Sequence, residues 1–384
     1  MSLPIFDHEA LPVGKTPADQ QRNAALLSEY EYDKYVMSLT GYTGQDLQRI
    51  AFVRWQDAIR VRVGPRGNYK AGMAQMADGR LIAAVCRDNA RPDPTQRYFD
   101  IFLYESTDLG LSWRAMEHTP LLGKEPSLTA LPDSALLFTA QNGYFGPGAA
   151  NDSIYMARSE DGGRTWQVVN HPGNDYPRNV IIERDGSLTM VRALQNDWTG
   201  RGGGSPHLEV ARSTDGGRTW RASIGHIPWD YSAFGEISTI RLRDGRLLAA
   251  LRRQMPGTEG EGFEDTVLSE SLDDGQTWSA PWRMSQTAEV HTYLIELGDG
   301  RLLATYSNYH LPWGICAMIS ADGGRTWDHD HTIQLALSAS YSVGWPVTLQ
   351  LTDGSFITSY AATTYIEQAP GHVTCETVRW RLPE

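Results

Sequence analysis

One octapeptide recurs along the chain and constrains its fold more than any other feature. Its pattern is Ser-x-Asp-Gly-Gly-x-Thr-Trp, with full copies starting at Ser159, Ser213 and Ser320, a one-position variant at Ser271 and a degenerate copy at Ser106. Successive copies start 53, 54, 58 and 49 residues apart. A period near fifty residues indicates a repeat architecture, which has to be settled before any single residue is interpreted.

The octapeptide has the chemistry of a turn. Its Asp side chain can accept hydrogen bonds from nearby backbone N–H groups, and its glycines adopt positive φ without strain. Its carboxylates do not alternate as they do in an EF-hand loop, so a calcium site is not expected. We predict a turn between two outer strands of each repeat. The segments before the copies are the expected strands: Ile101–Tyr104, Ser153–Ala157, Leu208–Ala211, Thr266–Ser269 and Ile315–Ile319.

A second recurrent feature is a hairpin upstream of each octapeptide. Asp-Gly between two apolar runs is a strong hairpin signal, and with one variant at Pro132–Ser134 it makes six hairpins. Each repeat then contains four antiparallel strands, which predicts an all-β, six-bladed β-propeller over residues 50–384. The last blade lacks an octapeptide, so we expect its outer strand to come from Phe52–Val63. The Asp-Gly pairs start at Asp78, Asp185, Asp244, Asp299 and Asp353.

Residues 1–49 precede the repeats. Residues 1–15 are expected to form an extended arm, and Thr16-Pro17 is a typical start for a helix, which we predict as far as Ser38. The first ten residues lack a charged region followed by an apolar stretch, so no secretory signal is visible and a cytoplasmic location is expected. Secretion is the alternative if a leader has been removed.

Composition limits the partners that the chain can have. The formal net charge is −12, the pI is about 5.3 and no basic run occurs, so nucleic acid is not an expected partner. No segment approaches the length of an apolar membrane span. The three cysteines are far apart, which predicts neither a disulfide scaffold nor a zinc site. We therefore expect no metal or cofactor, and the sequence leaves the oligomeric state open.

Aligning the hairpins on their turns identifies candidate functional residues. One group lies eight residues before the Asp of each turn, at the expected start of the innermost strand, and four of its six members are ionisable. A second group follows the turns by about eight or nine residues. Antiparallel strands place both groups at one edge of a blade, so we predict a single mouth opposite the Asp-Gly turns. The first group is Lys70, Glu125, Pro177 (followed by Arg178), Glu236, His291 and Trp345; the second includes Arg87, Asp88, Asn142, Arg192, Arg252, Arg253, Asn308 and His310.

The octapeptide resembles the Asp-box, or bacterial neuraminidase repeat, of the sialidase superfamily. This resemblance covers roughly residues 50–384 and implies a six-bladed propeller. Sialidases bind the carboxylate of their substrate with three arginines, and they use an Asp acid and a Tyr nucleophile that is assisted by a Glu. The resemblance implies that Glu236 is this Glu, Arg252 one of the arginines, Tyr341 the nucleophile and Asp88 the acid.

The chain departs from the sialidase pattern at two positions. Lys70 stands where the first-blade Arg is expected, and His310 stands near the place of the fifth-blade Arg. A lysine is a point charge rather than a planar fork, so it would hold a carboxylate differently. We therefore expect a sialidase-like glycoside hydrolase acting on an anionic glycan of the sialate or uronate type.

The predicted site can be divided into two groups of residues. The catalytic group is Glu236, Tyr341, Asp88 and His291. The substrate-binding group is Lys70, Arg87, Glu125, Arg178, Arg192, Arg252, His310 and Trp345. Two alternatives stay open: a lyase on uronate glycans, with His291, His310 or Tyr341 carrying the proton, and a carbohydrate-binding propeller without chemistry.

Overall fold

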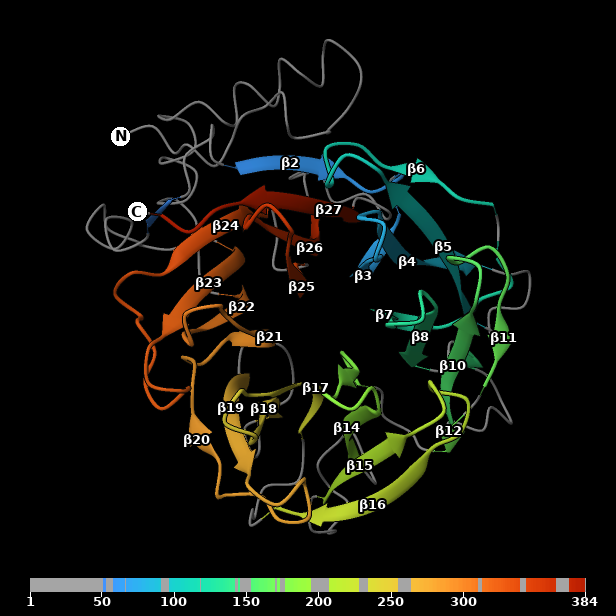
Figure 1. Ribbon diagram of the computed structural model, residues 1–384. Coiled ribbons are helices and arrows are strands. Elements are labelled where there is room, and N and C mark those ends of the chain that lie inside the picture. Colours follow the sequence, from blue (N-terminus) through green and yellow to red (C-terminus); the bar gives the residue numbers. More distant parts are fainter. Residues whose placement is uncertain are drawn as a thin grey trace, which may run out of the picture.

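The chain forms six sheets of mainly antiparallel strands, arranged as blades around a central axis (Figure 1). The computed structural model describes residues 51–52, 58–65, 67–90, 97–117, 119–141, 144–145, 153–169, 171–172, 177–194, 207–227, 234–254, 264–309, 313–338, 343–363 and 373–383. The predicted all-β, six-bladed propeller is confirmed. The helix predicted from Thr16 to Ser38 lies outside the described residues. Within the ranges above, no helix is long and apolar enough to cross a membrane.

The first three blades follow the chain without interruption. Blade 1 contains β3 (Tyr69–Gln75), β4 (Leu81–Ala90), β5 (Arg97–Ser106) and β6 (Arg114–Ala115), with β9 (Tyr144–Phe145) paired to β5. Blade 2 contains β7 (Lys124–Ala130), β8 (Leu136–Gln141), β10 (Ser153–Ser159) and β11 (Gln167–Val168), with β12 (His171–Pro172) paired to β10. Blade 3 contains β13 (Ile181–Ile182), β14 (Leu188–Leu194), β15 (His207–Ser213) and β16 (Arg221–His226).

The last three blades complete the ring. Blade 4 contains β17 (Phe234–Arg241), β18 (Leu247–Gln254), β19 (Glu264–Ser271) and β20 (Trp282–Arg283). Blade 5 contains β21 (Glu289–Glu296), β22 (Leu302–Asn308), β23 (Gly314–Ser320) and β24 (Ile333–Leu337), and β1 (Ala51–Phe52) runs parallel to β24. Blade 6 contains β25 (Gly344–Gln350), β26 (Phe356–Thr363), β27 (Val373–Trp380) and β2 (Ala58–Arg62).

The ring closes by pairing the two ends of the propeller. Strand β2, from before blade 1, pairs antiparallel with β27, and Figure 1 shows the two side by side. This confirms that the outer strand of blade 6 comes from the Phe52–Val63 region. The closure is also joined by side chains, because the buried Arg60 of β2 bonds the carbonyl oxygen of Leu335 in blade 5.

The octapeptides form the expected turns between the third and fourth strands. In blade 2, Oδ1 of Asp161 accepts hydrogen bonds from the backbone N of Arg164 (3.0 Å) and of Thr165 (2.8 Å). Each turn also contacts the preceding blade. Arg158 of blade 2 donates to the carbonyl oxygen of Gly216 in the blade 3 octapeptide, at 2.9 Å. The repeat therefore joins blades as well as reversing the chain.

Apolar side chains fill the spaces between adjacent blades. One cluster joins Ile82 and Ala84 of blade 1 to Phe138 of blade 2, and a similar cluster joins blade 6 to blade 1 through Tyr104 and Ile357. All of these side chains are buried. This packing fixes the innermost strands, whose starts meet near the axis.

Candidate functional site

The innermost strands begin with residues in an uncommon backbone conformation. In five of the six blades, the first-group residue has a positive φ, between 45° and 61°. A non-glycine residue costs on the order of 1 kcal/mol in this region, and such strain is concentrated at functional sites. The five residues are Lys70 (φ 45°), Glu125 (φ 61°), Glu236 (φ 51°), His291 (φ 57°) and Trp345 (φ 56°).

Each of these five residues lies in a β-bulge. The register between first and second strands shifts at the same place in blades 1, 2, 4, 5 and 6, for example between Gly235 and Ser238 around Glu236. A bulge turns a side chain out of the regular alternation of its strand. Five blades therefore direct the first residue of their innermost strands toward shared contacts near the axis.

Blade 3 differs because Pro177 occupies the equivalent position. The proline ring fixes φ near −65°, so this residue cannot adopt the left-handed conformation of the other five. Its innermost strand β13 is correspondingly short, and Arg178 lies between Pro177 and that strand. The guanidinium of Arg178 is buried and donates to the carbonyl oxygens of His291, Thr292 and Pro346.

Glu236 is the centre of this cluster. Its Oε1 lies 3.1 Å from Nη1 of Arg252 and accepts a 3.1 Å hydrogen bond from the indole Nε1 of Trp345. Its Oε2 lies 2.9 Å from Nε2 of His291. Burial, at 3% exposure, favours the neutral acid, but the contact with His291 and the charges of Arg252 and Lys70 outweigh it and hold the pKa of Glu236 well below its usual value. Glu236 is therefore ionised at neutral pH.

His291 is the neutral partner of Glu236. Burial at 1% exposure lowers its pKa to about 3, against the attraction of Glu236 and with the help of Arg252 and Arg178. A neutral imidazole has one donor and one acceptor nitrogen. Nε2 lies 2.9 Å from Oε2 of Glu236 and 3.4 Å from Nη1 of Arg252. The shorter contact is with a carboxylate, which only accepts, so we assign the proton to Nε2, and Nδ1 then accepts from the hydroxyl of Ser307 at 2.9 Å. The hydroxyl of Tyr309 is also close, at 3.3 Å from Nδ1.

Lys70, Glu125 and Trp345 extend the cluster across the axis. Nζ of Lys70 forms an ion pair with Oε1 of Glu125 and lies 3.5 Å from the centroid of the Trp345 indole. The opposite partner of this indole is His291, stacked at a centroid distance of 4.5 Å. Burial lowers the pKa of Lys70 to about 8, although Glu125 partly offsets the effect. Trp345 thus links the lysine–carboxylate pair to the histidine–carboxylate pair.

Arg252 is held by a residue that sequence reasoning missed. Glu264 accepts two hydrogen bonds from the guanidinium of Arg252, from Nε to Oε2 at 2.9 Å and from Nη2 to Oε1 at 2.6 Å. Glu264 lies at the start of β19, two residues before the strand that the sequence predicted from Thr266. The next residue of each strand forms a pair of the same kind, because Arg253 bonds Asp265. The sequence signal that could have found Glu264 is therefore the two adjacent arginines followed by two adjacent acidic residues. The side chain of Arg252 is 19% exposed.

Two predicted binding residues have partners outside this cluster. Arg87 donates to Oδ1 of Asn68 (3.1 Å from Nε and 2.6 Å from Nη2) and lies over the ring of Phe102. Arg192 is buried and pairs with Glu209, with Nε 2.6 Å from Oε1. The structure therefore brings together Lys70, Glu125, Arg178, Glu236, Arg252, His291 and Trp345.

The remaining predicted site residues fall where the structure gives no side-chain description. Asp88 belongs to β4, toward the end that is far from the Asp-Gly turn, and only its backbone is described. His310 and Tyr341 lie outside the described residues, so their roles stay predictions. The described ranges contain no group of three or more His, Cys, Asp or Glu side chains arranged to hold a metal ion.

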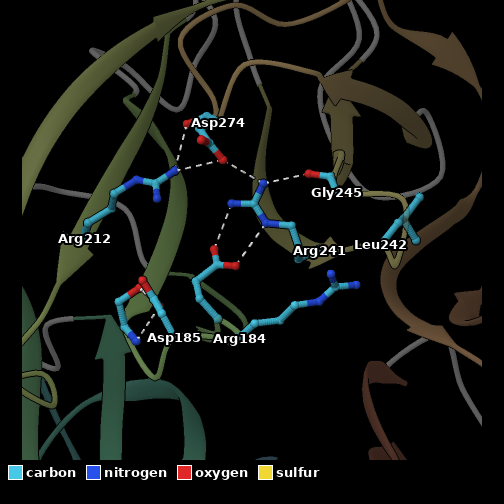
Figure 2. A pocket seen from close by; sticks show the side chains of 9 residues that line it. Arg184, Asp185, Arg212, Arg241, Leu242, Gly245 and Asp274 are labelled. Carbon is cyan, nitrogen blue, oxygen red and sulfur yellow. Dashed lines mark hydrogen bonds and ion pairs between the residues drawn. The ribbon is translucent and has the colours of Figure 1, made fainter.

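The Asp-Gly end of the propeller has pockets of a different kind. Figure 2 shows one of about 370 Å³ between blades 3 and 4, where Arg241 bonds both carboxylate oxygens of Glu183 and also Asp274. A second cavity of about 420 Å³ lies beside it and includes Glu296 and Gln350 in its lining. The ion pairs in Figure 2 link blades 3 and 4, and their one left-handed residue, Asp274 (φ 60°), stands where the full octapeptide has a glycine. Five left-handed residues converge at the opposite end, so we place the candidate active site there.

Comparisons with known proteins agree with the fold. A sialidase of Micromonospora viridifaciens is 29% identical over 255 residues, which are 59% of this chain and 38% of the length of that protein. A Hadza microbial sialidase, Hz136, aligns over 83% of this chain and 68% of its own with a TM-score of 0.55 and 19% identity. The α-L-arabinofuranosidase Arb93A of Fusarium graminearum aligns over 85% and 98%, with a TM-score of 0.60 and 15% identity. No family model matches the chain. The chain is a sialidase-like six-bladed β-propeller.

Proposed function

We propose that this protein is a glycoside hydrolase whose active site is the Glu236 cluster. The observation that carries the proposal is the state of Glu236: a buried carboxylate in a strained bulge, kept ionised by His291, Arg252 and Trp345. Glycoside hydrolases of most families use one carboxyl group to protonate the leaving oxygen and a second group as nucleophile or base. An ionised Glu236 suits the second role. The similarity to sialidases and to an arabinofuranosidase supports the same class of reaction.

In the proposed mechanism, Glu236 acts as base for Tyr341. The carboxylate takes the phenolic proton as the phenolate oxygen attacks the anomeric carbon, and Asp88 protonates the departing glycosidic oxygen. Water then attacks the anomeric carbon and displaces the tyrosine oxygen, giving its proton to Asp88 while Glu236 returns the phenolic proton to the tyrosine oxygen. His291 and Arg252 keep Glu236 ionised in the resting enzyme, so that it can accept the phenolic proton in the first step. A direct attack by Glu236 is the simpler variant, and it predicts that Tyr341→Phe keeps most of the activity.

The substrate class is proposed in two forms. An anionic sialate- or uronate-type sugar is favoured by Arg252, whose side chain is partly exposed and lies beside the central carboxylate. A neutral glycoside is favoured by the pairing of the described cations, since Lys70 faces Glu125 and Arg252 faces both Glu236 and Glu264. A substrate carboxylate would have to share Arg252 with two glutamates or bind groups outside the described residues.

A panel of fluorogenic glycosides tests the proposal. Purified protein is assayed with 4-methylumbelliferyl α-N-acetylneuraminide, β-glucuronide and α-L-arabinofuranoside, and with uronate oligosaccharides monitored in the ultraviolet. Release of methylumbelliferone by the wild type but not by Glu236→Gln supports the hydrolase. Ultraviolet absorbance from an unsaturated product, without fluorogenic turnover, would instead support the lyase. Binding without turnover of any member would support a carbohydrate-binding propeller.

A further inference from the structure

Arg178 has a set of contacts that no other residue of the cluster has. Its backbone N donates to the carbonyl oxygen of Ile237 in blade 4 at 3.1 Å, and its own carbonyl oxygen accepts from the hydroxyl of Ser127 in blade 2 at 2.8 Å. Its guanidinium crosses the axis to blades 5 and 6. Nη1 bonds the carbonyl oxygens of His291 and Thr292, and Nη2 bonds that of Pro346 at 2.6 Å. One residue of blade 3 is thus bonded to four other blades.

These contacts fall on or next to the strained residues. Ile237 directly follows Glu236, Pro346 directly follows Trp345, and His291 is itself a bulge residue. A left-handed non-glycine residue persists only where surrounding structure over-determines it. Each bulge also leaves backbone groups that the strand ladder does not pair, and a buried carbonyl oxygen needs a donor. The guanidinium of Arg178 supplies such donors to two bulges at once.

The proline of blade 3 explains why this residue can serve the other blades. Pro177 cannot form a left-handed bulge, and β13 begins only at Ile181, so the chain at Arg178 is not engaged in a strand ladder. A planar guanidinium with fixed donor directions can bond several carbonyl oxygens together, which a lysine ammonium on a flexible stem does poorly. Arg178 is 5% exposed, so its N–H groups bond these carbonyl oxygens rather than water.

We infer that Arg178 is a positioning residue that holds the bulges of His291 and Trp345 so that both side chains reach Glu236. This inference rests on the proposed function, because it assigns Arg178 a part in that reaction without contact to the substrate. It replaces the substrate-binding role that the sequence suggested. Without the Arg178 guanidinium, the backbone of the His291 bulge is no longer fixed, and Nε2 of His291 then no longer stays at hydrogen-bond distance from Glu236.

Kinetics of two variants test this role. Arg178→Lys keeps the positive charge but loses the fork, and Arg178→Met loses both. We expect both to lower kcat at least 30-fold on whichever fluorogenic glycoside the wild type hydrolyses, with KM within threefold. Arg184→Met is the matched control: Arg184 also bonds a neighbouring blade, through the carbonyl oxygen of Arg243 at 3.0 Å, but at the Asp-Gly end shown in Figure 2. It should keep the wild-type kcat.

Three kinetic outcomes would overturn the inference. A raised KM with unchanged kcat would mean that Arg178 binds substrate. A lowered Tm with unchanged kcat of the folded protein would mean a structural role alone. Wild-type kcat in Arg178→Lys would mean that charge, not the fork, matters. If both Arg178 variants fail to fold, Ser127→Ala removes only the hydroxyl bond to Arg178, and we expect a fewfold loss of kcat, whereas an unchanged kcat would count against the inference.

A spectroscopic test is independent of catalysis. The ring ¹⁵N signals of His291, assigned with His291→Gln, should show a neutral imidazole with the proton on Nε2 between pH 5 and 8 in the wild type and in Arg184→Met. The charged and titratable groups around this ring are Glu236 of β17, Arg252 of β18, Arg178 before β13 and Tyr309 after β22. In Arg178→Lys, where the charge is kept, we expect the ring to exchange between tautomers. An unaltered ring spectrum would refute the positioning role even if no glycoside is hydrolysed.

Discussion

Oε2 of Glu236 and Nε2 of His291 lie 2.9 Å apart, and both residues adopt a left-handed backbone at the start of innermost strands in adjacent blades. Neither side chain would reach the other from a regular strand, because the bulges turn them toward the axis. The pair is asymmetric in charge: the carboxylate is ionised and the imidazole is neutral. The chemistry proposed for this site depends on that asymmetry.

Trp345→Phe isolates the indole hydrogen bond to Glu236. Phenylalanine keeps an aromatic face for His291 and Lys70 but removes the Nε1 donor, which is bonded to the carboxylate at 3.1 Å. Hydrogen bonds to charged groups contribute about 1.5–3 kcal/mol, so we expect kcat to fall about 10-fold to 100-fold. Trp113→Phe is the control, because its Nε1 bonds Thr377 away from the site. Equal activity of the two variants would contradict the role of Trp345.

We expect the ionisation of Lys70 to set an alkaline limit to activity. Its pKa of about 8, lowered chiefly by burial, means that the charge facing Glu125 is lost as the pH rises through 8. We expect kcat/KM to fall above this pH, and Lys70→Arg, which does not titrate there, to lose that limb. The effect of pH on stability is opposite to its effect on activity. Between pH 8 and about 10.5 the unfolded chain keeps the Lys70 proton and the folded protein loses it, so the contribution of Lys70 to stability increases over this range. An alkaline limb that persists in Lys70→Arg would assign the titration to another group.

The fold could be predicted from the sequence because its signals are local. The octapeptide and the Asp-Gly hairpins gave the number of blades, and the shared register grouped Lys70, Glu125, Glu236, His291 and Trp345 correctly. The left-handed bulges were not predictable, since the usual sequence sign of positive φ is glycine and none of these residues is glycine. The partners of Arg178 were not predictable either, because they are main-chain carbonyl groups 113, 114 and 168 residues away.

Glu289 should make stability depend on pH independently of catalysis. Burial raises its pKa to about 7, against a hydrogen bond from the backbone N of Gln286. The folded state therefore binds a proton more tightly than the unfolded state, and stability is lost as the pH rises from about 4.5 to about 7. We expect Glu289→Gln to increase the free energy of unfolding by about 1–3 kcal/mol at pH 8 and to leave it nearly unchanged at pH 4. Urea unfolding at both pH values measures this, with exposed Glu117→Gln as control.

A substitution of Asp161 tests whether the octapeptides serve the fold alone and take no part in catalysis. Its carboxylate accepts hydrogen bonds from the backbone and hydroxyl of Thr165, at 2.8 and 2.6 Å, within the blade 2 octapeptide. Asp161→Ala should lower the free energy of unfolding by about 1–2 kcal/mol, comparable to the loss of a helix cap, and leave kcat of the folded protein unchanged. A large loss of kcat without a loss of stability would show that the octapeptide takes part in function.

The central claim is that hydrolysis depends on an ionised carboxylate at Glu236. Glutamine has nearly the same shape and keeps one acceptor oxygen, so Glu236→Gln changes the charge with little change in packing. The decisive measurement is kcat of Glu236→Gln relative to the wild type on the glycoside that the wild type hydrolyses, at a temperature where circular dichroism shows both folded. We predict a loss of about 10³-fold or more, equivalent to roughly 4 kcal/mol in the barrier. Retention of wild-type kcat by a folded Glu236→Gln would contradict the account.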